Sequence, residues 1–474
     1  MSTDERDRTA GPALGHRVRR VREAVALPGP FPAAPAGSGL ATVPGDAGSP
    51  LVGHTFSATR DPVAWGRGRL AEHGPISWSC GFGRRIVSVV GPEAAEAVLV
   101  NRERVFAARP GWEHFLGPFF RGGLLTLDGD EHVRQRRVVQ QAFTADRLRG
   151  YLDRMNRVIE AGLDGWRPAD PFPVVPAVKR LTLGLAADVF LGAGLGRESE
   201  VVRAAFADMT GAVTSLVRVG LPGTRWARGL AGRRVLERFC AQRLPAKRAG
   251  ADPDLFGMLC HARADDGLRF DDTEVVDHVI GLLLAAHDTT TSALSSMVHR
   301  LARHPEWQDR ARAESRALGR GFVEWGDLGR LTALDLVEKE SLRLVTPIPV
   351  FPRQTARDTG LLGRHLPAGT LVTVTPQVNH HLPELWPDPE RFDPERFAAH
   401  RREDRVHRYA WTPFGGGVHK CAGAQFADVH IKALLHQVLL RFRIAVAPDY
   451  ETRFDFSALP VPRDGLPVRL ERIG

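Results

Sequence analysis

The stretch of sequence that decides the fold is Phe414-Gly415-Gly416-Gly417-Val418-His419-Lys420-Cys421-Ala422-Gly423. One cysteine follows three glycines and two basic residues, and a further glycine comes two positions later. Glycine allows the backbone to fold tightly around a bulky planar group. A thiolate at the cysteine can then act as an axial iron ligand that pushes electron density toward bound oxygen. The alternative interpretation is a buried structural cysteine in a glycine turn.

A second motif is Ala285-Ala286-His287-Asp288-Thr289-Thr290, inside a long apolar helical run that starts near Asp272. An acid beside a hydroxyl in a dry pocket can hold a water chain that delivers protons to bound oxygen. Consecutive threonines can also hydrogen-bond back to carbonyls and bend the helix. The alternative interpretation is an Asp-Thr pair that caps the N-terminus of a helix.

Two further motifs place pairs of polar residues one turn apart on predicted helices. Glu340 and Arg343 stand at i and i+3, a spacing that brings a carboxylate to a guanidinium. The alternative interpretation of this pair alone is a surface salt bridge. His132 and Arg136 share one helix face, which suits either a bound anion or a solvated basic helix.

Together the four motifs resemble the cytochrome P-450 superfamily, in order and rough spacing, from about residue 50 to the end. The resemblance implies that Cys421 is the axial thiolate of haem b and that Asp288 and Thr289 are the acid–alcohol pair. It also implies a structural ion-pair network of Glu340, Arg343 and Arg396. The residues expected to contact haem are His132, Arg136, Ala285, Ala286, Arg353, Phe414, Gly415, Gly417, His419 and Gly423.

The sequence departs from the common family pattern at three of these motifs. His419 stands where most relatives have arginine, as in the sterol-demethylase branch, and Ala286 stands where glycine is frequent. The methyl group of Ala286 narrows the space over the iron. Thr346 replaces a common proline, which is a minor change.

The expected fold is mainly α with a small β subdomain: the family's triangular prism, with haem between the long central helix and the Cys-ligand loop. Apolar periodicity predicts helices almost throughout residues 130–345, a hairpin over 76–91, and strands at 370–375 and 442–446. Residues 1–49, rich in Pro, Gly and Ala, are expected to form a flexible segment. Residues 50–474 are expected to form a single catalytic domain.

Composition excludes several other classes of protein. The 474 residues are 43% hydrophobic and 25% charged, and the net charge is +9. No basic block with interleaved aromatics points to nucleic acid. Cys80, Cys240 and Cys260 lie in apolar contexts and are expected to be buried small hydrophobes, as suits a reducing cytoplasm. No apolar run is long enough for a membrane anchor, so we expect a cytoplasmic protein. We also expect it to be a monomer.

The family reading implies a monooxygenase that inserts one oxygen atom of O2 into a lipophilic small molecule. No flavin, nicotinamide or iron–sulfur motif follows Cys421, so NAD(P)H is expected to act only through a separate ferredoxin and ferredoxin reductase. Arg137, Lys420 and Lys432 are expected to steer an acidic ferredoxin.

Segments expected to meet above the haem are mostly apolar, which favours a lipophilic substrate. The expected pocket residues are Trp112, Phe115, Phe119, Phe120, Leu284, Ile348, Val350, Phe351, Leu459 and Val461. The C-terminal tail and His419 favour a terpenoid or steroid-like substrate in secondary metabolism. Polyketide or macrolide tailoring is the alternative substrate class. A peroxide-driven haem-thiolate enzyme and a non-catalytic haem binder are alternatives of a different class.

Overall fold

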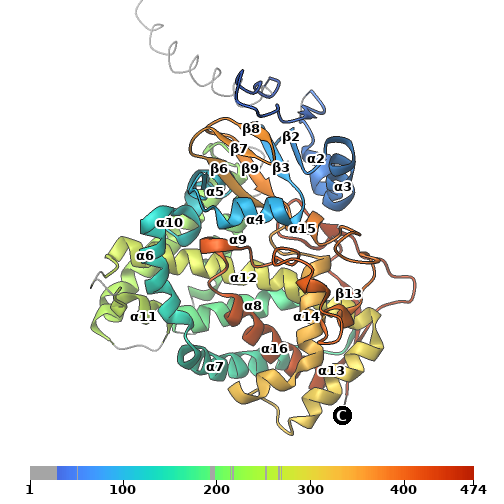
Figure 1. The fold of residues 1–474 in the computed structure, drawn as a ribbon. Helices are drawn as coiled ribbons and strands as arrows, with labels where there is room; N and C mark the ends of the chain where they lie inside the picture. The colour runs from blue at the N-terminus through green and yellow to red at the C-terminus, as the bar shows by residue number, and fades with distance from the viewer. Residues whose placement is uncertain are drawn as a thin grey trace, which may run out of the picture.

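Helices dominate the structure, a computed structural model that describes residues 29–473 apart from 51, 193–197, 214, 216–217, 251–253, 265–266 and 268. Figure 1 shows a layer of strands at one end of the molecule and a larger body of helices beneath it. This arrangement confirms the predicted fold class, mainly α with a small β subdomain.

The α-helices of the described residues range from a single turn to 32 residues. They are α2 Thr55–Arg60, α3 Pro62–His73, α4 Pro92–Val100, α5 Arg109–Leu116, α6 Gly129–Gln140, α7 Ala145–Asp164, α8 Val174–Leu191, α9 Ser199–Val213, α10 Arg225–Ala249, α11 Leu255–His261, α12 Asp272–Arg303, α13 Pro305–Ala317, α14 Thr332–Leu344, α15 Pro376–Asn379 and α16 Ala424–Arg441. Short 3-10 helices that matter below are η1 Gly117–Phe119, η6 Pro394–Phe397 and η8 Gly417–His419.

The strands form one sheet of six and three smaller sheets within the described residues. They are β1 Gly45–Asp46, β2 Ile76–Gly81, β3 Arg84–Val89, β4 Phe106–Ala107, β5 Ala169–Pro173, β6 Phe351–Thr355, β7 Thr359–Leu361, β8 Arg364–Leu366, β9 Leu371–Val374, β10 Phe442–Ala445, β11 Phe454–Asp455, β12 Val461–Pro462 and β13 Pro467–Arg472. The large sheet has the order β1-β2-β3-β9-β6-β4, and a second sheet has the order β10-β13-β5.

The predicted hairpin over 76–91 is confirmed as β2 and β3, which pair antiparallel with Ile76 opposite Val89. Phe82 and Gly83 form its turn, both with positive φ, and two such residues match the right-handed twist of the flanking strands. β3 also pairs in parallel with β9, with Ile86 opposite Leu371. The sheet therefore joins the first and last quarters of the chain.

The long helix α12 begins at Asp272, where the apolar run predicted it. Asp271 caps it by accepting from the Glu274 backbone N–H at 2.8 Å, and the Glu274 carboxylate accepts from Asp271 N–H at 2.9 Å. Such a reciprocal capping box satisfies two amide groups that the helix itself leaves free. α12 crosses the centre of the helical body in Figure 1 and packs against α8.

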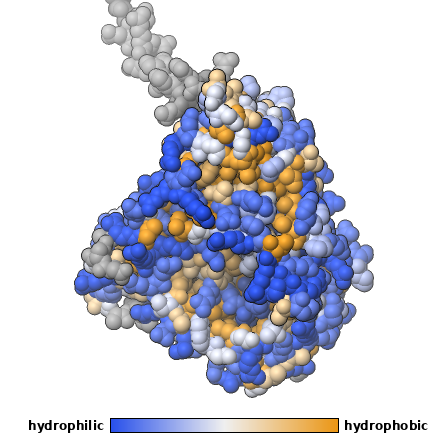
Figure 2. Space-filling model, in the orientation of Figure 1, coloured by the Kyte–Doolittle hydropathy of each residue, from blue (hydrophilic) through white to orange (hydrophobic). Residues whose placement is uncertain are grey.

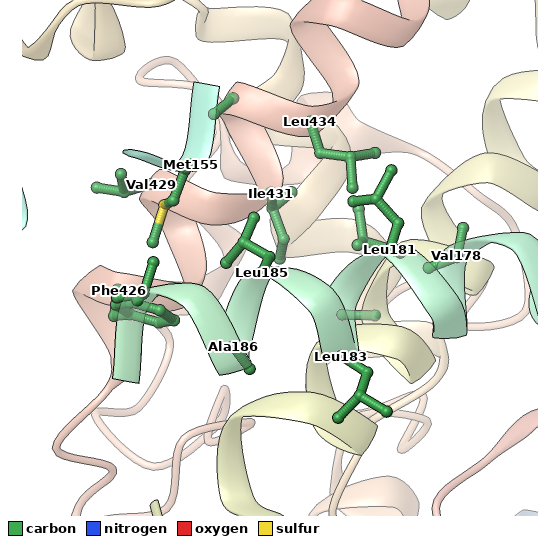
Figure 3. Packing of buried hydrophobic residues seen from close by; sticks show 14 of the residues in the cluster. Met155, Val178, Leu181, Leu183, Leu185, Ala186, Phe426, Val429, Ile431 and Leu434 are labelled. Atoms are coloured by element: carbon green, nitrogen blue, oxygen red, sulfur yellow. The ribbon is translucent and has the colours of Figure 1, made fainter. Parts of the chain in front are cut away.

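The main hydrophobic core lies where α7, α8, α12 and α16 meet. Figure 3 shows Leu181 and Leu185 of α8 pointing toward Ile431 and Leu434 of α16, while Leu183 points to the opposite side of α8. Ile431 and Leu434 are at most 1% exposed. Burying a side chain of this size contributes about 2 kcal/mol, so the helix that follows Cys421 is firmly anchored.

Two features of the fold differ from the sequence-based expectation. The ordered chain begins before Pro50, because Phe31 and Val43 are buried and β1 already belongs to the large sheet. Residues 1–28 of the expected flexible segment lie outside the described residues. Within the stretch predicted to be helical, Ala169–Pro173 forms β5, which pairs with β13.

The surface on the face drawn in Figure 2 is mostly hydrophilic, with hydrophobic side chains gathered over the sheet end and near the middle. Cys80, Cys240 and Cys260 are buried as expected. Among the described residues, no helix combines the length and the apolar character needed to cross a bilayer.

Candidate active site

The Cys421 loop is closed by a backbone hydrogen bond and is followed directly by a buried helix. Cys421 N–H donates to the Phe414 carbonyl at 2.8 Å, which closes the loop across η8. α16 begins three residues after the cysteine, so the buried helix holds the end of the loop in place. Phe414 packs half-buried against the same core cluster as Ala286 of α12.

Three glycines of the loop pack against neighbouring groups, and at two of them, Gly416 and Gly417, a side chain would clash. A Cβ atom on Gly417, whose φ is +63°, would lie 1.9 Å from the Leu99 carbonyl oxygen at the end of α4. A Cβ on Gly416 would lie 2.5 Å from the Tyr409 ring, and one on Gly415 would touch the Phe351 ring of β6 at 3.6 Å. The glycines therefore let the loop seat against α4 and β6 as one rigid unit.

The Cys421 thiol is open to a ligand although protein surrounds it. Its side chain is exposed, yet burial by neighbouring groups raises its pKa. The exposed fraction of the side chain describes access to the sulfur. The raised pKa reflects the bulk water that neighbouring groups exclude from it. Access decides whether a metal can reach the sulfur. A backbone hydrogen bond from Gly423 and the charges of Arg136 and Lys420 favour the thiolate, and a coordinating metal deprotonates a thiol outright.

Two histidines stack beside the loop. The rings of His132 and His419 lie 3.9 Å apart between centroids, at 31°. His419 Nε2 is 3.5 Å from an oxygen of Asp128, and that carboxylate also accepts from the backbone N–H groups of Ala108 and Arg109, both at 2.8 Å. The hydrogen bonds from His419 and these two amides outweigh burial and lower the pKa of Asp128.

The two ring nitrogens of His132 have no hydrogen-bond partner among the described residues. Burial, with His419 and Arg136 nearby, lowers its pKa to about 3, and both ring nitrogens are buried without a hydrogen bond. Arg353 is 3% exposed, and its pKa is lowered to about 10 by burial. Buried polar atoms are normally satisfied, so this cluster of donors fits a bound anionic group.

The donor set therefore fits haem b, which needs one axial ligand and groups that meet its two propionates. Cys421 provides the ligand type, His132 provides ring nitrogens without a partner, and Arg353 provides a buried cation. His419 stacks on His132 beside the loop. Arg136 lies nearby but donates to the Lys420 carbonyl at 2.6 Å, so it also braces the loop.

Asp288 and Thr289 lie in the middle of α12, so the alternative reading of this pair as a helix N-cap is wrong. Thr289 Oγ1 donates to the Ala285 carbonyl at 2.6 Å. Such back-bonding bends helices and here fixes the hydroxyl beside Ala285, which is itself exposed. The lone pairs of the hydroxyl oxygen remain free to accept a hydrogen bond.

Two cations or donors flank the Asp288 carboxylate. Nδ1 of His287 lies 3.0 Å from it, and Nζ of Lys179 on α8 lies 3.4 Å from it. Burial would raise the pKa of Asp288, but His287 and Lys179 outweigh it and the pKa is lowered. Both ring nitrogens of the buried His287 therefore face acceptors, because Nε2 lies 3.1 Å from the Lys179 carbonyl and Nδ1 lies 3.0 Å from the Asp288 carboxylate.

The predicted ion-pair network of Glu340, Arg343 and Arg396 is assembled, and all three side chains are at most 2% exposed. Arg343 binds Glu340 through two hydrogen bonds of 2.7 and 2.9 Å, and Arg396 Nε approaches Glu340 to 3.5 Å. The Asp393 backbone N–H completes the set at 2.9 Å. Buried charges need this degree of satisfaction, so the network holds α14 to η6.

The residues expected to form the pocket occupy three kinds of environment. Phe119, Leu284 and Phe351 are buried, and Phe119 packs edge-on to Trp226 of α10. Trp112 and Ile348 pack half-buried on the core cluster that contains β2 and β3. The half-buried remainder is Phe115, Phe120, Val350, Leu459 and Val461.

The prediction that Lys432 lies at the surface is wrong. Lys432 is 6% exposed and is held by Asp428 at 2.6 Å and Asp335 at 3.6 Å. It therefore does not belong to a surface that steers a partner. Arg137 and Lys420 are both exposed.

Sequence reasoning missed two residues that tune this site. Asp128 holds His419, and Lys179 pairs with Asp288. Both lie far along the chain from their partners, and no local spacing signals such contacts. The only hint was the position of Asp128 at the start of the helix that carries His132.

Comparison with known proteins agrees with this geometry. The sequence profile of the cytochrome P450 family matches residues 44–223 and 233–464. The chain is 44% identical over 442 residues to cytochrome P450 136 of Mycobacterium tuberculosis, covering 92% of this chain and 90% of that protein. It is 32% identical over 421 residues to cyclooctat-9-en-7-ol 5-monooxygenase of Streptomyces melanosporofaciens, covering 86% and 90%.

A solved structure supports the same assignment. The retinoic acid-bound cyanobacterial CYP120A1 superposes with a TM-score of 0.82 at 29% identity, over 92% of this chain and 100% of that one. With the cysteine loop, the central helix and the ion-pair network assembled as described, the chain belongs to the cytochrome P450 family and is a P450 monooxygenase.

Proposed function

We propose that this monooxygenase hydroxylates a lipophilic, terpenoid- or steroid-like small molecule in secondary metabolism, in one oxidation or several. The observation that carries the proposal is a set of apolar side chains left half-buried on separate segments: Phe115, Phe120, Val350, Leu459 and Val461. Sites for small lipophilic molecules are lined in this way. The names of two similar proteins refer to a cyclooctatenol and to retinoic acid, both terpenoid compounds.

The haem-thiolate group supplies, when bound, the reductive activation of O2 that no side chain can perform. His132, His419 and Arg353 would hold its propionates, and Cys421 would ligate the iron. The close seating of Gly417 on Leu99 keeps the thiolate at a fixed position relative to α4. These residues bind and orient the group, which is the protein's share of the chemistry.

Proton supply falls to α12 and α8 in this proposal. The lowered pKa of Asp288 means that its carboxylate is ionised at neutral pH, so it acts as a proton acceptor and does not carry a proton of its own at rest. Lys179 is 47% exposed at its side chain and touches Asp288, so it connects the buried carboxylate to solvent. Thr289 Oγ1 donates a hydrogen bond to the Ala285 carbonyl, and its lone pairs can accept a hydrogen bond from a water molecule.

Electrons are proposed to come from a separate acidic ferredoxin, served by its reductase and NAD(P)H. Val418 of the cysteine loop is 53% exposed and Val133 of α6 is 36% exposed, with Arg137 and Lys420 close to them in the sequence. An apolar centre with a basic rim suits a transient acidic partner.

The test is an optical titration of the purified ferric holoenzyme with terpenes, steroids, macrolides and fatty acids. A low-spin to high-spin shift of the Soret band with terpenes or steroids, followed by a hydroxylated product when ferredoxin, reductase and NADPH are supplied, is the expected result. A shift and product with macrolides alone would contradict the substrate class. Turnover with hydrogen peroxide alone, and none with the electron-transfer proteins, would contradict the proposed electron route.

A further inference from the structure

Arg218 is a half-buried cation whose charge no carboxylate neutralises among the described residues. It lies in the segment between α9 and α10. Its Nε donates to the Ser215 carbonyl at 3.3 Å, and one terminal nitrogen, Nη1, donates to the His114 carbonyl at the end of α5. The guanidinium also lies over the Trp226 ring, 5.7 Å from its centroid. Nη2, the other terminal nitrogen, has no protein partner among the described residues.

Two acidic side chains on the adjoining helices are paired with other arginines. Glu113, next to His114 on α5, pairs with Arg109 at 3.7 Å. Asp208 of α9 pairs with Arg228 of α10 at 3.8 Å. Burial lowers the pKa of Arg218, with no carboxylate to oppose it. Taking a charge out of water without a partner is costly, so this arrangement is unfavourable until an anion arrives.

A second unsatisfied group lies beside Arg218. Nε2 of His114 is buried without a hydrogen bond among the described residues. Burial, together with Arg218 and Arg84, lowers the pKa of His114 to about 4, so the ring is neutral at pH 7. A neutral imidazole that carries its proton on Nε2 can donate one hydrogen bond to an anion. Phe115 packs edge-on against His114 at 4.9 Å, which makes the surroundings apolar as well as positive.

Helix α5 connects Arg218 and His114 to the residues expected to contact haem. α5 packs along β6, so closely that a Cβ on Gly111 would lie 2.8 Å from the backbone of Arg353. Gly111 and His114 are three residues apart, about 5 Å along a helix axis. Trp112, between them, packs on the core cluster that contains Phe351. In Figure 1, α5 lies between the strands at the top and α10.

We infer that Arg218 and His114 bind the carboxylate of the substrate, which is therefore a lipophilic carboxylic acid. Nη2 of Arg218 supplies a charge-assisted hydrogen bond, His114 Nε2 supplies a neutral one, and Trp226 and Phe115 cover the carbon atoms next to the carboxylate. The acid group is held at the outer end of α5 and the apolar part extends toward Phe351 and Cys421. This inference rests on the proposed function, because it specifies the substrate class of the same site.

The experiment compares carboxylic acids with their own methyl esters. Geranic, farnesoic and all-trans-retinoic acid and the three methyl esters are titrated into the holoenzyme, by Soret shift and by calorimetry. At least one acid should bind ten-fold or more tightly than its ester. Arg218→Gln should weaken acid binding by about 10- to 100-fold and leave the ester unchanged, since a hydrogen bond to a charged group is worth about this factor.

Matched variants separate this role from a structural one. Arg225→Gln removes an exposed arginine at the start of α10 and should keep the preference for the acid. Arg218→Lys keeps the charge and should retain part of the preference. Equal binding of every acid and its ester, or an unchanged preference in Arg218→Gln, overturns the inference.

Failure of the proposed function would look different. If the reduced protein with carbon monoxide shows no thiolate band, the haem-thiolate assignment fails, while calorimetry still reports whether acids bind. A normal thiolate band with no acid preference overturns only the role of Arg218 and His114.

Discussion

At the scale of single residues, Asp288 and Thr289 are held in place by different kinds of contact. Asp288 is tied to Lys179 and His287, whereas Thr289 is tied only to its own helix. We therefore expect Asp288→Asn to lower kcat on the order of 10²-fold, the usual contribution of a positioned acid or base. Substrate affinity and the thiolate optical band should be unchanged. Thr289→Ala should instead convert more of the consumed O2 into hydrogen peroxide, and Thr289→Ser should restore the yield of product.

The control for these variants is Asp272→Asn, which alters an exposed carboxylate in the first turn of the same helix. It should leave turnover and peroxide release at wild-type values. Steady-state rates, oxygen consumption and product yield, measured with one substrate, provide the comparison. Wild-type turnover in Asp288→Asn would contradict a role in proton delivery.

Most residues of the candidate site could be predicted from the sequence, because each of their motifs lies within a short segment of the chain. The cysteine loop and Glu340 with Arg343 each lie within one short segment. Asp128 and Lys179 were not accessible, because their partners arrive from other elements. Lys432 was misjudged for the same reason, since Asp335 and Asp428 enclose it only in the folded chain.

At the scale of elements, the cysteine loop depends on its fit against α4. Gly417→Ala should prevent the loop from seating, because the added Cβ would lie 1.9 Å from the Leu99 carbonyl and φ is +63°. We expect loss of most haem incorporation and of the thiolate band, with far-UV circular dichroism nearly unchanged. Gly150→Ala in α7 is the control, since a Cβ there also meets nothing within 4 Å. Equal haem content in the two variants would show that the loop is not held this tightly.

Element prediction succeeded where periodicity was long and failed where strands were short. α12 and the β2–β3 hairpin followed from 3.6- and two-residue patterns. β5 contains two prolines in five residues and, in the described part of the chain, pairs only with β13. Its strand character comes from that distant partner, which no local pattern encodes.

At the scale of the whole molecule, several buried histidines link stability to pH. The pKa of His278 is lowered to about 4 and those of His299 and His381 to about 3, each mainly by burial. In the unfolded chain these groups titrate near 6.5. The unfolded state therefore binds more protons below that pH, so stability falls as pH decreases from about 6.5 toward 3–4. Each contributes at most about 2 kcal/mol of loss between pH 7 and pH 5.

Urea unfolding of the holoenzyme at pH 7 and pH 5 measures this effect. The free energy of unfolding should be lower at pH 5, and His299→Gln should reduce the difference. His400→Gln changes a side chain that is 68% exposed and should leave the difference as it is. Equal stability at the two pH values would contradict the account.

The contact between Gly417 and Leu99 also has a consequence for how the protein is made in the cell. Leu99 leaves the ribosome 318 residues before Gly417, the residue that seats against it. Contacts between such distant segments form late and slowly. Chains that have not yet reached Gly417, or that are truncated before it, therefore carry no finished seat for the prosthetic group, and loading of that group becomes a checkpoint on synthesis of the cysteine loop.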